Sequence, residues 1–247
     1  MNRLSRIALA ASLTATAALG LASAAQAAPQ LLIREAHRGA TAAGDYVMLQ
    51  MIADGQNTLA GNYIDILGAD GQAGAEYQLP NVANGQNQRT VLIGNTGVAG
   101  ADFTNAGVAL QTDGAVCLDT HGGYDGTGGF DCVAWGNFVG NVHPLSSPAL
   151  PTVLGGVGLA PGQTLVRTIA RGCATALDAP DDTNNSAADF ALGTGIGRPN
   201  AATPTETLCT GGGTTTTTPK KKCKKKKKKK HSAESAKKKK CKKKKKH

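Results

Sequence analysis

Short runs of apolar or alternating residues recur along the chain between residues 31 and 169. Residues 45–52 are nearly all apolar, which is typical of a strand buried on both faces. Residues 62–67 place apolar side chains on either side of Asp65 and end at a Gly-Ala-Asp-Gly turn signal. Runs about ten residues apart with turn residues between them predict an all-β fold, a β-sandwich of about nine short strands. The expected strands cover residues 31–36, 45–52, 62–67, 76–79, 90–94, 108–111, 115–118, 131–135 and 163–169.

Local signals add a hairpin and leave little room for helix. Asp113-Gly114 lies between the apolar runs 108–111 and 115–118, so a tight hairpin is expected there. Only residues 170–177 and 99–106 have the composition of a helical turn. We expect the folded unit to end near Arg198-Pro199-Asn200.

The N-terminal residues have the three parts of a secretory signal peptide. Residues 1–6 carry two arginines, residues 7–25 form an uncharged run rich in Ala and Leu, and Ala25-Gln26-Ala27 is a small-x-small cleavage site. The alternative is an uncleaved membrane anchor, but the run is only weakly apolar. Cleavage after Ala27 predicts an extracellular or cell-surface protein without a membrane span.

Charge divides the remaining chain into two parts. Residues 28–219 contain six arginines and 16 acidic residues, a net charge of −10, and no lysine. Residues 220–247 contain 19 lysines and one glutamate, a net charge of +18. We therefore expect a signal peptide (residues 1–27), a sandwich domain (28–205), a Gly/Thr/Pro linker (206–219) and a disordered tail (220–247).

The tail is expected to bind polyanions by counterion release. It has no aromatic residue to stack on bases, and lysine lacks the bidentate fork of arginine, so sequence-specific nucleic-acid recognition is not expected. For an exported chain, anionic cell-envelope polymers or other extracellular polyanions fit as partners, and docking on the acidic body is the alternative. The predicted polyanion-binding residues are Lys220, Lys221, Lys222, Lys224, Lys225, Lys226, Lys227, Lys228, Lys229, Lys230, Lys237, Lys238, Lys239, Lys240, Lys242, Lys243, Lys244, Lys245 and Lys246.

Six cysteines in an exported chain are expected to form disulfides. Cys117 and Cys132 flank a Gly/Asp-rich loop between two strand-like runs, as neighbouring strands of a hairpin would. Cys173 and Cys209 are the other pair of the body, and the tail holds Cys223 and Cys241. No C-x-x-C-like spacing indicates a zinc site.

Several short motifs, in this order, resemble the lamin-tail domain, an Ig-like β-sandwich also found in secreted bacterial proteins. The motifs are LIREAH (residues 32–37), DYVMLQ (45–50), GNYI (61–64), CVAWG (132–136), LAPGQTLVR (159–167), DDTNNSAADF (181–190) and RPN (198–200). The resemblance spans about residues 30–203 and implies an attachment module without shared catalytic residues. Met48 stands where that family usually has glutamate, so no role of that glutamate is carried over.

Oxygen-rich loops are the remaining candidates for chemistry. Asp178, Asp181, Asp182, Asn184 and Asn185 offer the ligands that Ca²⁺ prefers, but Asp and Asn in a surface turn also bond their own backbone. No nucleophile or zinc-protease motif surrounds the body histidines, so we predict no catalytic residue, no cofactor and no enzyme. The predicted function is a secreted, non-enzymatic attachment module. The alternative is a calcium-dependent ligand-binding domain or a cryptic hydrolase that uses these loops.

Overall fold

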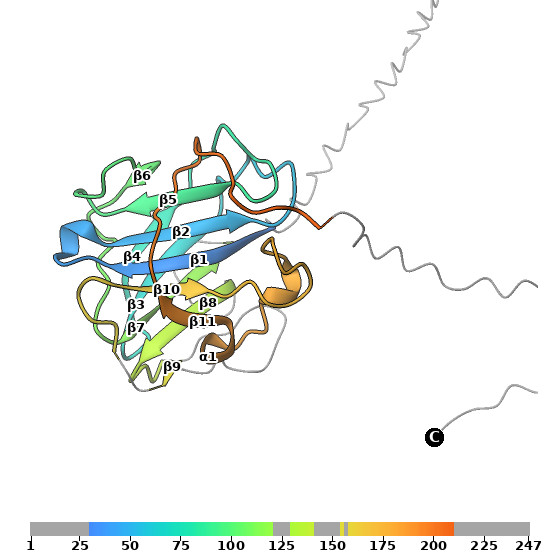
Figure 1. Ribbon diagram of the computed structural model, residues 1–247. Helices are drawn as coiled ribbons and strands as arrows, with labels where there is room; N and C mark the ends of the chain where they lie inside the picture. The colour runs from blue at the N-terminus through green and yellow to red at the C-terminus, as the bar shows by residue number, and fades with distance from the viewer. Residues whose placement is uncertain (1–29, 121–128, 141–153, 156–157, 210–247) are drawn as a thin grey trace, which may run out of the picture. The chain divides into compact units, whose positions relative to one another are not determined.

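A computed structural model describes residues 30–120, 129–140, 154–155 and 158–209 (Figure 1). In this part the chain is all-β, with strands in two sheets and almost no helix. Sheet A has the strand order β11-β10-β1-β2-β5-β6, and sheet B has the order β4-β3-β7-β8-β9. The strands are β1 (Leu31–Arg38), β2 (Tyr46–Met51), β3 (Tyr63–Gly68), β4 (Ala73–Gln78), β5 (Thr90–Gly94), β6 (Phe103–Thr104), β7 (Gly114–Asp119), β8 (Gly129–Gly136), β9 (Leu154–Gly155), β10 (Gln163–Arg167) and β11 (Phe190–Gly193).

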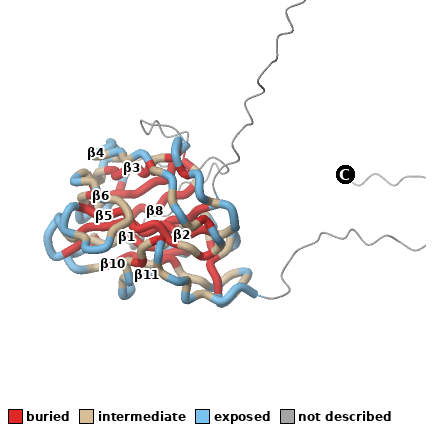
Figure 2. The backbone as a smooth tube through the Cα atoms, turned by 90° about the horizontal axis from the view of Figure 1, so that it is seen from above, coloured by how far each residue is buried: buried red, intermediate tan, exposed pale blue. Residues whose placement is uncertain are grey.

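The two sheets share one apolar core, as in a β-sandwich. Ile33 and Val47 from sheet A and Ile64 and Val116 from sheet B belong to the same buried cluster. Figure 2 shows the buried residues gathered along the strands and the exposed residues on the connecting loops. Adjacent strands are antiparallel except for the short pairs β5–β6 and β8–β9. The predicted all-β sandwich is therefore confirmed.

The expected hairpin between residues 108–111 and 115–118 is wrong. Residues 108–111 are buried at Val108 and Leu110 but lie in neither sheet. Side chains replace a neighbouring strand there: Asp45 accepts from the Leu110 amide at 2.6 Å, and Asn95 donates to the Val108 carbonyl at 2.8 Å. An apolar run can thus be buried without strand pairing when side chains satisfy its backbone groups.

The helical turns also lie elsewhere than expected. Residues 170–177 form bends and a turn, and residues 99–106 include the short strand β6. The helical residues of the described chain are α1 (Ser186–Asp189) and two 3-10 turns, Ala42–Gly44 and Ala179–Asp181. Asn185 caps α1 by accepting a hydrogen bond from the Ala188 amide at 3.1 Å.

Both disulfides predicted in the body are present. Cys117 on β7 pairs directly with Cys132 on β8 in the antiparallel register, and Cys173 is bonded to Cys209. Trp135 is 1% exposed and lies in the core between the sheets, whereas the Cys117–Cys132 bond lies in a separate apolar cluster on the other face of β8. Trp135 therefore packs in the core and not against that disulfide.

A C-terminal strap, defined as residues 194–209, crosses the outer face of sheet A (Figure 1). It is bonded in turn to β1, β2 and β5: Glu35 accepts from the Gly197 amide, Met48 Sδ from the Arg198 amide, and Thr90 donates to the Arg198 carbonyl at 2.6 Å. The last described residue of the strap, Cys209, is held by its disulfide. The central strands β2 and β5 of sheet A are buried along their whole length, which accounts for their nearly continuous apolar sequences.

The sequence predictions for the signal peptide (residues 1–27), the lysine tail (220–247) and its cysteines Cys223 and Cys241 concern residues outside the described part of the chain. Within the described residues, no helix has the length and apolar character needed to cross a membrane.

Candidate functional site

The most highly charged part of the described interior is built around Arg167, at the end of β10. Its side chain is 0% exposed and its Nη2 lies 2.5 Å from Asp131 Oδ1 on β8, so this ion pair joins sheet A to sheet B. The guanidinium carbon also lies 4.5 Å from the ring centre of Phe190 on β11. A charge buried this deeply needs complete pairing, because removal from water is costly.

The ion pair also completes the backbone hydrogen bonding of β1 at Ile33. Strand β10 pairs with β1 only from Glu35 to Arg38, and the register of β1 with β2 shifts between Ile33 and Glu35. At Ile33 the missing strand is replaced by side chains. The Ile33 amide donates to Asp131 Oδ2 at 2.6 Å, and its carbonyl accepts from Arg167 Nε at 2.8 Å. The pair therefore ends the β1–β10 ladder without leaving buried backbone groups unsatisfied.

The electrostatics of this pair are set by opposing effects. Burial raises the pKa of Asp131 to about 6, although the Arg167 charge acts to lower it, and the nearby Asp182 carboxylate raises it further. Burial opposes the charge on Arg167, yet the pKa of Arg167 is raised because the carboxylates of Asp131 and Asp182 outweigh burial. Arg167 is thus a permanent cation in a region rich in carboxylates.

The Asp/Asn-rich loop predicted as a calcium candidate lies beside Arg167. Asp181 is fully buried and accepts from the Ala170 and Arg171 amides at 2.9 and 2.8 Å. Asp189, also buried, accepts from the Thr183 amide at 2.8 Å and lies 3.0 Å from Arg171 Nη1. Among the described residues, no group of three or more metal-ligating side chains is placed to hold a metal ion. These two carboxylates instead bond the backbone of their own loop, as Asp does in turns.

Asp182 differs from its neighbours because it lies at the surface of the cluster. Its side chain is 16% exposed, and its Oδ1 lies 3.3 Å from Arg167 Nη1 and 3.1 Å from the Asn184 amide. Behind it, the carboxylates of Asp131, Asp181 and Asp189 are buried. Three carboxylates, those of Asp131, Asp182 and Asp189, thus face the two guanidinium groups of Arg167 and Arg171, and the Asp181 carboxylate lies in the same loop, so the cluster carries excess negative charge.

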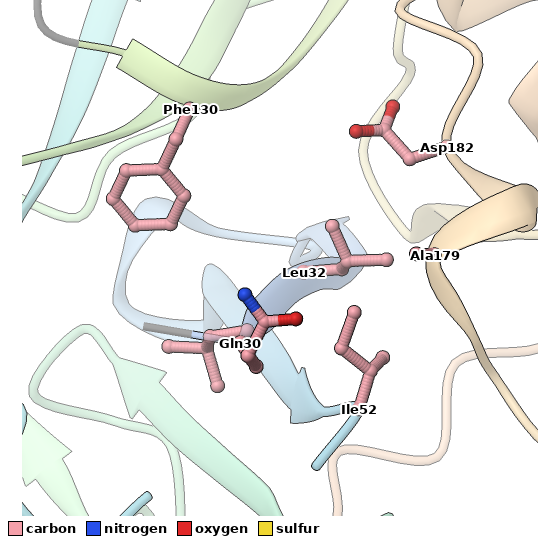
Figure 3. Close-up of a pocket in the computed structure, with 7 residues that line it drawn as sticks. Gln30, Leu32, Ile52, Phe130, Ala179 and Asp182 are labelled. Carbon is pink, nitrogen blue, oxygen red and sulfur yellow. The ribbon is translucent and has the colours of Figure 1, made fainter. Parts of the chain in front are cut away.

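A pocket of about 180 Å³ opens between the start of β1, the start of β8 and this loop (Figure 3). Its walls are mostly apolar, and its polar groups are an amide and a carboxylate. In Figure 3 the Asp182 carboxylate is directed from the loop toward the side on which Phe130 lies. The residues that line the pocket are Gln30, Leu31, Leu32, Ile52, Phe130, Ala179 and Asp182. This pocket and the charged cluster behind it are the candidate site.

A second polar cluster lies under the strap. The Tyr46 hydroxyl donates to Glu35 Oε2 at 2.8 Å, and His37 Nδ1 lies 2.8 Å from Thr164 Oγ1 with its ring stacked on Tyr46. Burial lowers the pKa of His37, and burial together with Glu35 raises the pKa of Tyr46. Glu35 also accepts from the Ile196 and Gly197 amides. This cluster fastens the strap to sheet A.

Sequence reasoning found the loop of the candidate site but not the pocket. Asp178, Asp181, Asp182, Asn184 and Asn185 lie together as expected, each in a local turn. The pocket residues were missed because Leu32, Ile52, Phe130 and Asp182 are brought together only by the fold. One signal was available: Arg167 and Asp131 each lie in an apolar run, and a charge inside a strand often indicates a buried partner.

Comparison of the chain with protein-family models, curated proteins and solved structures finds no match. The resemblance to the lamin-tail domain stays a prediction from the motifs, while the two-sheet architecture rests on the structure.

Proposed function

We propose that the protein is an exported, non-enzymatic attachment module in which the lysine tail holds the β-sandwich body to anionic polymers of the cell envelope. The observation that carries the proposal is the separation of charge: all 19 lysines follow residue 219, and the body has none. Nineteen ammonium groups in 28 residues bind a polyanion through counterion release, whatever its sequence.

The disulfides agree with an exported protein. Two disulfides brace the body, and such bonds persist in oxidising compartments. Together with the signal-peptide pattern of residues 1–27, they support a location outside the cytoplasm.

The placement of the acidic residues favours an external partner for the tail over the body. Of the 15 acidic residues in the described part of the chain, seven are buried and only Asp54, Asp70 and Glu76 are exposed. Buried carboxylates such as that of Asp45, which accepts hydrogen bonds from two backbone amides, stabilise the fold. They present little charge to the lysines of the tail. The net charge of −10 therefore overstates the attraction of the body surface for the tail.

The test compares three proteins on cell-envelope fractions and on a heparin resin over a series of salt concentrations. These are the chain after signal cleavage, the same chain with all 19 tail lysines replaced by glutamine, and the chain with the lysines replaced by arginine. For the first and third proteins, the logarithm of the binding constant should fall linearly with the logarithm of the salt concentration. The glutamine variant should not be retained. Equal retention of the glutamine variant, or of a protein lacking residues 219–247, would refute the proposal.

A further inference from the structure

We propose that the pocket beside Asp182 is a binding site for a small primary alkylammonium ion, with its hydrocarbon chain against Leu32, Ile52 and Phe130 and its ammonium group on the Asp182 carboxylate. This site would add a second binding activity to the body. It is independent of the lysine tail and of the attachment function proposed above.

The pocket walls suit a short hydrocarbon chain. Of its lining residues, Leu31 and Leu32 are buried, and Ile52 and Phe130 are half-buried. A volume of about 180 Å³ admits a small molecule and not a folded segment. Burying each methylene group of a ligand against such walls contributes about 0.8 kcal/mol.

The Asp182 carboxylate is held in place by the protein through one of its two oxygens. Within the described residues both contacts of Asp182, to Arg167 and to the Asn184 amide, are made through Oδ1. These contacts fix the carboxylate, and Figure 3 shows it directed over the pocket. The side chain is 16% exposed, so a ligand can reach it, whereas the carboxylates of Asp181 and Asp189 are buried and bonded to the loop backbone.

The charge behind the pocket favours a cation. Asp131, Asp181, Asp182 and Asp189 outnumber Arg167 and Arg171, and the charge of Asp182 acts on Asp131 through the interior. A cation at Asp182 would offset this excess, and an anion would be repelled. Because interactions at a partly buried site are screened less than at an open surface, the preference should be substantial at moderate salt.

The composition of the pocket selects an organic cation over a metal ion. Ca²⁺ requires six to eight oxygen ligands, whereas the side chains lining the pocket offer the Asp182 carboxylate and the Gln30 amide. An ammonium group has three N–H donors, which the Asp182 carboxylate, the Gln30 amide oxygen and water can accept, and the Phe130 ring adds an aromatic surface that attracts cations. The apolar walls then bind the carbon chain, which a hydrated metal ion lacks.

The experiment follows the methyl and aromatic NMR signals of the complete body-and-tail protein during titration with n-butylamine at neutral pH. Saturable shifts at Leu32, Ile52 and Phe130 are expected, and n-butanol, which has the same chain without the charge, should bind at least tenfold more weakly. Asp182→Asn keeps an oxygen that can accept from Arg167 and from the Asn184 amide but removes the negative charge. The variant should therefore bind butylamine at least tenfold more weakly. Asp70→Asn, the same change in an exposed turn of sheet B, should have no effect.

The proposal would be overturned by the absence of a saturable shift at the pocket in the unmutated protein, by equal affinity for n-butanol, or by unchanged affinity in Asp182→Asn. Butylamine binding that appears only after removal of residues 28–29 would also overturn it, because the chain itself would then be the occupant. The first readout needs no variant, so poor folding of Asp182→Asn would leave the test intact. The variant with a glutamine tail should bind butylamine as the unmutated chain does, so this site can fail or succeed apart from the attachment function.

Discussion

Replacing Arg167 by methionine tests how the two sheets are joined. Asp131 is 1% exposed and would lose its partner at 2.5 Å, and the Ile33 carbonyl would lose its 2.8 Å donor. Breaking one side of a buried ion pair costs about 3–5 kcal/mol, so Arg167→Met should lower the free energy of unfolding by this amount.

The double variant Arg167→Met with Asp131→Leu separates the charges from the backbone. Replacing a whole buried ion pair by apolar residues is often neutral or stabilising. Here the same change leaves both the Ile33 amide and the Ile33 carbonyl without their side-chain partners. Each unsatisfied buried group costs about 1–3 kcal/mol, so the double variant should remain clearly less stable than the unmutated protein.

The assay is urea unfolding with the disulfides intact, followed by the fluorescence of the single tryptophan, Trp135, which is buried in the core. Asp131→Asn is the comparison variant: its amide oxygen can still accept from the Ile33 amide, but Arg167 loses its closest carboxylate, so a loss of stability similar to that of Arg167→Met is expected. A double variant within about 1 kcal/mol of the unmutated protein would refute the role given to the pair at Ile33.

Three further predictions concern pH, the strap and the disulfides. Because burial raises the folded-state pKa of Asp131 from its ordinary value of 3.8 to about 6, its contribution to stability is present below 3.8 and lost as the pH rises through 6. Urea unfolding from pH 3.5 to 7 should therefore show the unmutated protein losing stability relative to Asp131→Asn as the pH rises, and a constant difference would contradict this. Tyr46→Phe removes the hydroxyl group that donates a hydrogen bond to Glu35, so it should lower the free energy of unfolding by about 1–2 kcal/mol. Amide hydrogen exchange at Ile196 and Gly197, whose amides also bond to Glu35, should become faster. Unchanged exchange there would argue against the role of this cluster in holding the strap. Replacing Cys117 and Cys132 by alanine should lower the free energy of unfolding by about 3 kcal/mol, and replacing Cys173 and Cys209 by about 4 kcal/mol. The second loss is larger because the sequence separations of the two pairs are 15 and 36, and the longer loop restricts the unfolded chain more. The reverse order in urea unfolding would exclude loop entropy as the main cause.

The strand pattern was predictable where strands are continuous and apolar. Residues 45–52 and 90–94 were read correctly because a fully buried strand needs nothing but apolar, β-favouring residues. Strand β11 was missed because Ala191, Leu192 and Gly193 are exposed and carry no alternating pattern; their strand conformation comes from pairing with β10. Residues 108–111 show the opposite error. Their backbone groups are satisfied by side chains outside the run, since Asp45 accepts from the Leu110 amide and Asn95 donates to the Val108 carbonyl.

The candidate site was predictable only in part for a related reason. The turn-forming loop is a local property, and its Asp and Asn residues identify it in the sequence. The Arg167–Asp131 pair and the pocket are properties of the assembled sandwich. Leu32 and Asp182 are 150 positions apart, and no local pattern relates them.

The Cys173–Cys209 bond has a mechanical consequence for an attached protein. If a surface polymer holds the tail while fluid flow drags on the body, tension enters the described chain at Cys209. The disulfide passes this tension by covalent bonds to Cys173 and the loop of Asp178 and Asp181, so the strap between residues 194 and 208 carries little load. Without the bond, the same pull would act on the strap from its end and break the hydrogen bonds of Arg198 and then of Gly197 to sheet A in succession. The disulfide would thus determine whether tension first releases the tail from the polymer or first detaches the strap from sheet A.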